Sequence, residues 1–388
     1  KSFDAPPSPV LPHKRSTPAP CRQLSPPRGA GTRRRPGSEL WESLGDLSLD
    51  VLCFLNAEFI CHLSCAAVTL REACSVHGPG GRRLVTPHAS VSSESCEKWV
   101  QQVWFPHVFW VEARDLNPKA CRCLMAVLER RGPCAARALL TLDLRNTKLQ
   151  GCADSVVAIL RACSSLQSLN LGRTRLKDEG AQALAYGLCA DDPETGRPRP
   201  HPSLKFLSLE ECGLTKVSGP AIATAALAVP CLEELLLGRN ELGDETAIAL
   251  ASSMTPRGFG FGGASLTRLD LSENQLMGEG LAALAGALGR HGYLQSLDVG
   301  GNEKIGGILA TVSEVTHQVM EGLNSACALR DLHLWRCGLY DESANLLVDS
   351  LPPRLRLLNI AANPFTRELR RKLVRQRGSG GATVSIRA

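Results

Sequence analysis

Leucines recur in one pattern of eleven residues, L-x-x-L-x-L-x-x-(N/C/T)-x-L, between residues 139 and 366. The alternating leucines of this short run predict a strand of a few residues whose leucines face the core. The pattern occurs eight times, and its matches start at Leu139, Leu166, Leu204, Leu232, Leu266, Leu294, Leu329 and Leu355. This recurrence predicts an internal repeat in which each unit adds one strand.

The segments between the matches follow a helical period. In DEGAQALAYGL, Ala181, Leu184, Ala185 and Leu188 stand at i, i+3, i+4 and i+7, which predicts an amphipathic helix. One strand and one helix cannot bury these leucines alone, so the units must stack around a continuous core. The sequence therefore predicts an α/β solenoid with a curved parallel sheet inside and helices outside.

The ninth position of the pattern must satisfy backbone groups in each turn. Asn provides both a donor and an acceptor for this task, whereas Thr and Cys do it less completely. We therefore expect structural roles for Cys212 and Cys337, rather than redox or metal chemistry. The position is held by Thr147, Thr174, Cys212, Asn240, Asn274, Asn302, Cys337 and Asn363.

The intervals between matches are 27, 38, 28, 34, 28, 35 and 26 residues, so every second interval is long. Two long intervals contain the loop-like stretches 190–203 and 255–265, and the third indicates a longer helix around 312–325. Because repeats stack in register, we expect these insertions along one rim, either as plain loops or as a ridge that contacts a partner.

These repeats resemble the ribonuclease-inhibitor-like class of leucine-rich repeat. The resemblance covers about residues 139–366, and the degenerate stretches VFWVEARDL and NPKACRCLMAVLERRG extend the predicted domain to 108–366. The function of a solenoid normally lies on its concave sheet, where the strand residues other than leucine point outward.

The chain before the repeats divides into three stretches. Residues 1–38 are rich in Pro, Arg and Ser, so we expect a disordered tail. Residues 41–75 place apolar side chains on one side of a helix or of two short helices. Residues 76–107 join a Gly/Pro/Ser-rich linker to the stretch SCEKWVQQVWFPHVFW, which we expect to form a helical cap on the solenoid.

The stretch within 41–75 resembles an F-box. It departs from that family at Gly45, which replaces the usual proline, and at Leu70, where Trp is common. The resemblance implies docking to a Skp-type adaptor and a cullin-RING ubiquitin ligase. The residues it assigns to adaptor binding are Leu52, Leu55, Phe59 and Leu63. The alternative is that this segment only caps the solenoid.

Charge is divided unevenly along the chain. The net charge is +6, but residues 1–38 carry eight Lys or Arg against one Asp, and the predicted C-terminal tail, 367–388, carries seven against one Glu. The body between them is therefore net negative, and only the tails suit a polyanion. The 16 cysteines are too sparse for a secreted disulfide framework, which favours the cytoplasm or the nucleus. The sequence contains no apolar run of 18 residues, so it predicts no membrane span.

Motifs of catalysis are missing from the sequence. The stretch from Gly258 to Gly263 matches G-x-G-x-x-G, but it precedes a strand instead of following one, so it does not predict dinucleotide binding. P-loop, H-E-x-x-H, G-x-S-x-G and C-x-x-C motifs are all absent. We therefore expect no enzyme activity, no catalytic residue, no cofactor and no metal.

The strand positions that point outward carry charges of both signs. A nucleic-acid groove should be a basic stripe, so this mixed surface indicates a protein partner. Trp and Arg are frequent interface hot spots, and Trp335 stands beside Gly300 and Gly301, where it either borders a pocket or packs on its neighbours. The candidate partner-binding residues are Asp331, His333, Trp335, Arg336, Arg239, Glu210, Glu211, Arg173 and Arg145.

Two functions fit these observations. The first is an F-box-type substrate receptor that recognises its target with the repeats. The alternative is a scaffold or a structural subunit of a larger assembly. A regulator similar to the Ran GTPase-activating protein shares the repeat type, but the C-terminus here is basic where that group has an acidic tail.

Overall fold

The computed structural model describes residues 88–90, 92–94, 110–129, 139–149, 151–189, 199–254, 265–309, 314–376 and 385–387. The predicted tail 1–38 and the F-box-like segment 41–75 lie outside these residues, as do Leu52, Leu55, Phe59 and Leu63. The loop stretches 190–198 and 255–264 also lie outside them.

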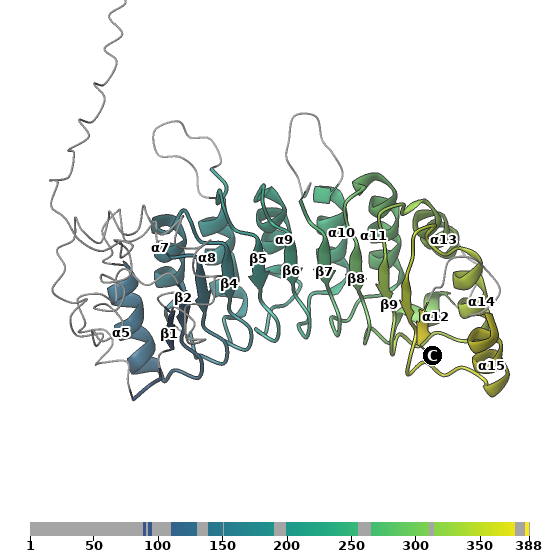
Figure 1. The fold of residues 1–388 in the computed structure, drawn as a ribbon, viewed down its shortest axis with the longest axis horizontal. Helices are drawn as coiled ribbons and strands as arrows, with labels where there is room; N and C mark the ends of the chain where they lie inside the picture. Colours follow the sequence, from purple (N-terminus) through teal and green to yellow (C-terminus); the bar gives the residue numbers. More distant parts are fainter. Residues whose placement is uncertain are drawn as a thin grey trace, which may run out of the picture. The chain divides into compact units, whose positions relative to one another are not determined.

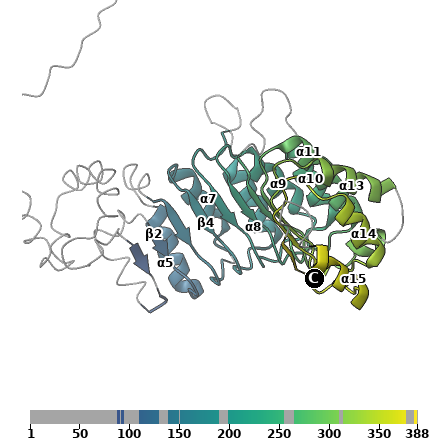
Figure 2. The ribbon, with the colours of Figure 1, turned by 45° about the vertical axis from the view of Figure 1, so that its right-hand side comes forward.

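All described strands join one parallel sheet in the order of the sequence (Figures 1 and 2). Each strand has three residues, as expected where one repeat contributes one short strand. The strands are β1 (His88–Ser90), β2 (Trp110–Glu112), β3 (Thr141–Asp143), β4 (Ser168–Asn170), β5 (Phe206–Ser208), β6 (Glu234–Leu236), β7 (Arg268–Asp270), β8 (Ser296–Asp298), β9 (Asp331–His333), β10 (Leu357–Asn359) and β11 (Ser385–Arg387). The strands β3 to β10 coincide with the eight matches of the leucine pattern, so the prediction of a strand in each repeat is confirmed.

The middle residue of each strand from β3 to β10 forms the centre of the core. These leucines are paired in register from strand to strand and are at most 1% exposed. Alternation within a strand sends the two flanking residues to the opposite face. The column consists of Leu142, Leu169, Leu207, Leu235, Leu269, Leu297, Leu332 and Leu358.

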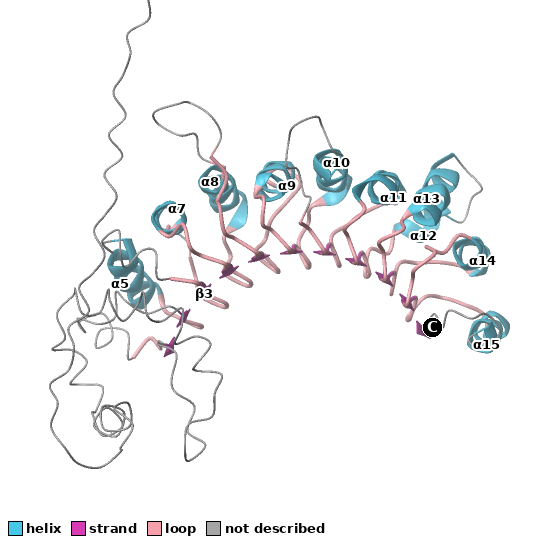
Figure 3. Ribbon diagram, turned by 45° about the horizontal axis from the view of Figure 1, so that its top comes forward, coloured by secondary structure: helices cyan, strands magenta, loops and turns pink. Residues whose placement is uncertain are grey.

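The helices cover one side of the sheet. In Figure 3 the strands follow an arc and the helices lie on its outer side, which confirms the predicted solenoid. We call the face of the sheet that points away from the helices the concave face. The helices are α5 (Pro118–Glu129), α7 (Ala153–Ala162), α8 (Lys177–Leu188), α9 (Gly219–Ala228), α10 (Gly243–Met254), α11 (Gly278–His291), α12 (Ile305–Leu309), α13 (Glu314–Ser325), α14 (Asp341–Asp349) and α15 (Arg367–Gln376).

An aspartate in the first turn of a helix ties one repeat to the next in three places. Asp178 accepts hydrogen bonds from the backbone N–H and the hydroxyl of Thr215 and from the Ser218 hydroxyl. Burial opposes its ionisation, but these hydrogen bonds outweigh burial and lower the pKa of Asp178. Asp244 accepts from the N–H of Met277, and Asp341 from Thr366. Each aspartate therefore links its own helix to the loop of the following repeat.

Buried asparagines form a hydrogen-bonded ladder along the repeats. Asn240 accepts from the N–H groups of Cys212 and Leu214 at 3.1 Å, and its amide donates to the carbonyls of Leu209 and Leu237 at 2.9 Å. One side chain thus satisfies backbone groups of two repeats, as predicted from its donor and acceptor.

Threonine and cysteine satisfy fewer groups in the same ladder. Thr174 donates to the carbonyl of Leu171 at 2.6 Å, and the Cys212 thiol donates to that same carbonyl at 3.0 Å. The Cys337 thiol donates to the carbonyl of Val299 at 3.3 Å, and burial raises its pKa to about 12. Both thiols are 0% exposed and hydrogen-bonded to backbone, which fits the expected structural role.

Several elements differ from the sequence-based expectation. The third long interval does not lengthen a helix; it contains the short α12 and the separate α13, which packs beside α11. Strand β1 lies in the stretch expected to be a linker and helical cap, and α15 and β11 lie in the stretch expected to be a basic tail. In the part of the chain that the structure describes, no helix combines the length and apolar character needed to cross a membrane.

Candidate functional site

The structure brings the nine candidate residues to the concave face, but it does not bring them together. They come from strand β9 and from the turns that follow β3, β4, β5, β6 and β9. Arg145, Arg173, Glu210, Glu211 and Arg239 form a group near one end, and Asp331, His333, Trp335 and Arg336 form a second group. The candidate site is therefore two sites on one sheet.

The residue before each ladder position has left-handed backbone. Its φ lies between 50° and 73° in nine consecutive turns, although this conformation is disfavoured for residues with a Cβ. Arg173, Arg239 and Arg336 are members of this column, a property that the sequence analysis did not find. The signal was Gly301, the one glycine at this position of the repeat. The full column is Asp115, Asn146, Arg173, Glu211, Arg239, Glu273, Gly301, Arg336 and Ala362.

In β3, β4, β7, β8 and β10 the last residue of the strand stabilises the turn that follows. Its side-chain oxygen accepts the N–H two residues further on, at 2.8 to 3.3 Å. Asp143, Asp270 and Asp298, which stand at outward-pointing strand positions, therefore shape the backbone. The residues are Asp143, Asn170, Asp270, Asp298 and Asn359.

Asp143 anchors two arginines at the first group. It is only 7% exposed, and it accepts from Arg145 Nε and Nη2 at 3.1 and 2.9 Å and from Arg114 Nε at 3.0 Å. Burial opposes ionisation of this carboxyl, but the hydrogen bonds from Arg145 and Arg114 hold its pKa below the usual value. Asp143 is thus a fixed negative charge that orients two guanidinium groups. Arg114 was absent from the residues picked from sequence.

The first group also carries a network of exposed ion pairs. Arg239 lies 3.3 Å from Glu273, 3.7 Å from Glu210 and 3.9 Å from Glu211, which also pairs with Arg173 at 2.9 Å. These side chains are about 40 to 50% exposed, so the pairs contribute little to stability. They present charges of both signs to a partner.

Trp335 fills the space beside the glycines. Any side chain at Gly300 would overlap the Trp335 ring, and the indole Nε1 donates to Asp298 Oδ2 at 3.4 Å. Of the two alternatives left by the sequence, packing on the neighbours is what the structure shows. Trp335 stays partly exposed, so one surface of the ring is still open to a partner.

Asp298 lies between two titratable neighbours on the adjacent strands. It is paired in register with Asp270 on β7 and with His333 on β9. Burial, with the nearby Asp270 charge, raises its pKa, although the Gly300 N–H, His333 and Trp335 act in the opposite direction. The second group therefore holds a carboxylate whose charge is only partly compensated.

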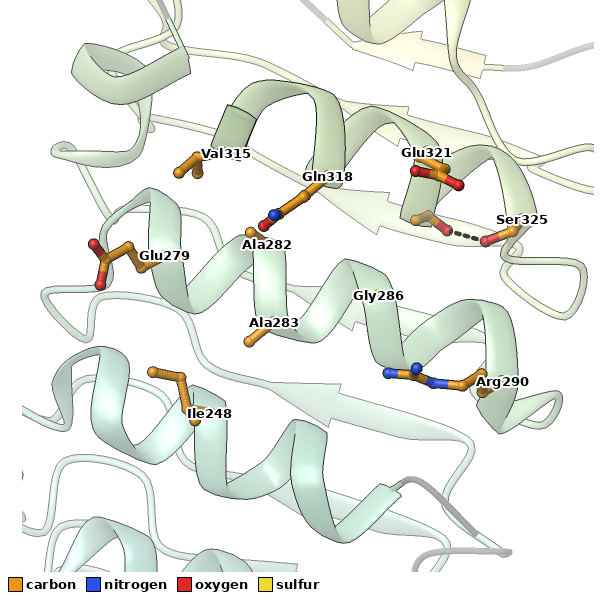
Figure 4. Close-up of a pocket in the computed structure, with 11 residues that line it drawn as sticks. Ile248, Glu279, Ala282, Ala283, Gly286, Arg290, Val315, Gln318, Glu321 and Ser325 are labelled. Carbon is orange, nitrogen blue, oxygen red and sulfur yellow. Dashed lines mark hydrogen bonds between the residues drawn. The ribbon is translucent and has the colours of Figure 1, made fainter. Parts of the chain in front are cut away.

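A second concavity lies among the helices on the outer side. Figure 4 shows the groove of about 450 Å³, with Val315, Gln318 and Glu321 of α13 on one wall. The α11 residues Glu279, Ala282, Ala283, Gly286 and Arg290 lie between α13 and α10, and Ile248 of α10 lines the other side. The helices that border the groove, α10, α11 and α13, pack side by side.

The described residues contain neither a disulfide nor a cluster of metal ligands. All nine cysteines in these ranges are free thiols. Among the side chains that the structure describes, no group of three or more His, Cys, Asp or Glu is placed to hold a metal ion.

Comparison with known proteins gives partial matches. A family model described as "Leucine Rich repeat" matches residues 162–185, 230–251 and 264–285. Ribonuclease inhibitor from Mus musculus is 30% identical over 48% of this chain and 36% of its own length, and that from Sus scrofa is 28% identical over 57% and 45%. "NACHT, LRR and PYD domains-containing protein 5" from Homo sapiens is 29% identical over 48% of this chain and 14% of its own.

The matched part of this chain thus spans less than half the length of these relatives. Their similarity coincides with the repeats whose strands, ladder and helices are described above. Leucine-rich repeats are protein-interaction modules, and the charged concave face suits that role. The described chain folds as a leucine-rich-repeat solenoid, and its repeats are similar to those of the ribonuclease inhibitors.

Proposed function

We propose that this chain recognises a folded protein target with its concave face. The observation that carries the proposal is the set of exposed ion pairs around Arg239, which lie on a backbone fixed by the buried ladder. A rigid surface with charges of both signs loses little entropy on binding and selects a partner by complementarity. Two of the relatives are named for inhibiting a ribonuclease, which supports a protein as the target.

The finer proposal is a substrate receptor of F-box type. Its support is the sequence of 41–75, with Leu52, Leu55, Phe59 and Leu63 as the residues that would bind a Skp-type adaptor and, through it, a cullin. The nine free thiols support a reducing compartment, and we place this activity in the cytoplasm or the nucleus. The scaffold role is the competing outcome of the same experiment.

The test is affinity purification of the full chain from cells, followed by proteomics. Four versions are compared: the natural sequence, Leu55→Asp with Phe59→Asp, Arg239→Glu with Trp335→Ala, and Arg290→Glu. The last is the matched control, because it makes the same charge change on the outer helix α11.

The expected result separates the two surfaces. Leu55→Asp with Phe59→Asp loses Skp and cullin peptides and keeps the target, whereas Arg239→Glu with Trp335→Ala does the reverse and Arg290→Glu keeps both. Absence of Skp and cullin from all four samples, with other partners recovered, would make this chain a scaffold. Retention of every partner by the concave-face variant would contradict recognition by that face.

A further inference from the structure

A hollow of about 390 Å³ opens on the concave face between the turn after β2 and strand β6. It is defined here as the arginine hollow, and the residues that carry the argument are Arg114, Arg145, Arg173, Asn170, Phe206 and Leu236. Three of its lining residues are arginines, and Glu210 is the one acidic residue among them. The hollow therefore offers several hydrogen-bond donors within one small volume.

Two of the guanidinium groups are held in place before any ligand arrives. Asp143 contacts Nε and Nη2 of both Arg145 and Arg114, while being almost fully buried. A guanidinium has five N–H donors, so Arg145 keeps donors beyond those that Asp143 takes. Arg114 also pairs with Glu112 at 2.6 Å and therefore keeps fewer. Preorganised arginines of this kind recognise carboxylates with two parallel hydrogen bonds. Arg173 adds a third guanidinium, paired with the exposed Glu211 at 2.9 Å.

Apolar side chains form the other wall. Phe206 is the first residue of β5 and Leu236 the last residue of β6, and both are partly exposed. In every other strand from β3 to β9 these two positions carry polar residues. The two apolar residues therefore interrupt a polar face at the one place where it borders three arginines.

We propose that the arginine hollow binds an acidic side chain of the partner protein, with an adjacent aliphatic or aromatic side chain on Phe206 and Leu236. This inference rests on the proposed recognition of a protein by the concave face. The carboxylate exchanges water for arginine donors, and the apolar neighbour is removed from water. A phosphate backbone fits less well, because Glu210 and Glu211 would repel a continuous chain of negative charge.

The experiment uses the purified full chain and a phage library of random eight-residue peptides. We expect selection of peptides with Asp or Glu next to Leu, Ile or Phe. Their affinities are then measured by fluorescence anisotropy on two variants, Arg173→Glu and Arg336→Glu. Both arginines are exposed and have the same left-handed backbone, and Glu already occupies this position at 211 and 273. Folding of the variants is checked by thermal melting.

We expect Arg173→Glu to lower the affinity for the selected peptides at least tenfold and Arg336→Glu to leave that affinity unchanged. Phe206→Ser, which copies Ser168 of β4, should remove the preference for the apolar residue and keep that for the acid. Equal binding by Arg173→Glu, or a selection with no acidic residue or no binder, overturns the proposal. Tighter binding of a 12-nucleotide single-stranded RNA, lost in Arg173→Glu, also overturns it and assigns the hollow to phosphates.

These outcomes are independent of the purification experiment. That experiment changes Arg239 and Trp335, neither of which lines the arginine hollow. A failed selection together with loss of the target in Arg239→Glu with Trp335→Ala would remove the acidic-peptide site and leave recognition by the concave face intact.

Discussion

The two ends of the concave face use the same repeat for opposite chemistry. At the arginine end, from β2 to β5, a buried Asp143 orients the arginines and an open hollow remains. At the tryptophan end, from β7 to β9, carboxylates on neighbouring strands are only partly compensated, and Trp335 fills the space over Gly300. The comparison shows that one backbone template supports a donor-rich hollow and an acidic, filled surface.

The two ends also differ in the ladder beneath them. Thr147, Thr174 and Cys212 serve the arginine end, whereas Asn274 and Asn302 serve much of the tryptophan end. Strands are spaced by roughly 4.8 Å, so β4 and β8 are separated by roughly 19 Å. A partner that reads both ends must therefore present a basic and an acidic feature about that far apart.

The largest effect is expected in the leucine core beneath the tryptophan end. Leu269→Asp puts a charge into the fully buried column between β6 and β8, and should cost more than about 4 kcal/mol of unfolding free energy. Thermal melting followed by circular dichroism measures it. Arg268→Asp, on the exposed side of the same strand, is the control and should melt almost normally. Unchanged melting of Leu269→Asp would show that the register is wrong.

The next largest effect is the loss of stability when a side chain of the buried ladder is removed at each end. Asn302→Ala removes the acceptor of the N–H groups of Asn274 and Leu276, both buried, and should cost about 3 kcal/mol. Thr174→Val keeps the shape of the side chain and removes its hydrogen bond to Leu171, which should cost about 1 kcal/mol. Urea unfolding of the two variants gives the difference. Equal losses would mean that the ladders of the two ends are equivalent.

Partner binding tests whether the tryptophan end takes part. Trp335→Ala should weaken binding of the target protein by about 2 kcal/mol, because a partly exposed tryptophan on a concave sheet is a typical hot spot. Titration calorimetry with the purified target measures the change, and thermal melting shows whether the fold is kept. Identical affinity of the variant would confine recognition to the arginine end.

The smallest effect is a pH response of opposite sign at the two ends. Burial lowers the pKa of His201, which precedes β5 and lies 3.2 Å from the carbonyl of Cys163. The unfolded chain then binds this proton more tightly, so stability at the arginine end falls as pH drops below about 6.5. The pKa of Asp298 is raised, so the folded chain binds its proton more tightly and stability at the tryptophan end rises with acidification towards pH 4.

Hydrogen exchange at pH 7 and pH 5, corrected for intrinsic rates, separates the two responses. Protection should fall around β4 and β5 and rise around β7 to β9. His201→Gln should abolish the first change and Asp298→Asn the second, and Asp298→Asn should also be more stable than the natural protein at pH 7. A uniform change along the repeats would refute the assignment to these two groups.

The sequence predicted what the repeat pattern controls. The column of leucines through Leu269 and the ladder through Asn302 followed from an eleven-residue period, because each position has one environment in every repeat. Strands β1 and β11 were missed because HAS and SIR carry no leucine pattern, although backbone pairing adds them to the sheet. The division between α12 and α13 was missed because both segments are apolar on one side.

The site was predictable only as a face. The repeat period alone placed Arg145 and Arg173 on the concave side. The arginine hollow also depends on Arg114 from a degenerate repeat and on the hydrogen bond that joins it to Asp143 of the next repeat. Whether Trp335 bordered a pocket or filled it depended on a side-chain rotamer. Such contacts between residues about thirty positions apart leave no signal in one sequence.

The column of residues with left-handed backbone links the stability of this protein to the charge of its concave face. A residue with a Cβ is strained there by roughly 1 kcal/mol, and glycine, as at Gly301, relieves that strain. Glycine at Arg173, Glu211 or Arg239 would also erase a charge from the surface that faces a partner. Thermal stability and partner recognition therefore place opposite demands on the same position of each repeat. Each glycine selected for thermal stability would remove one charged side chain and lower the selectivity of binding.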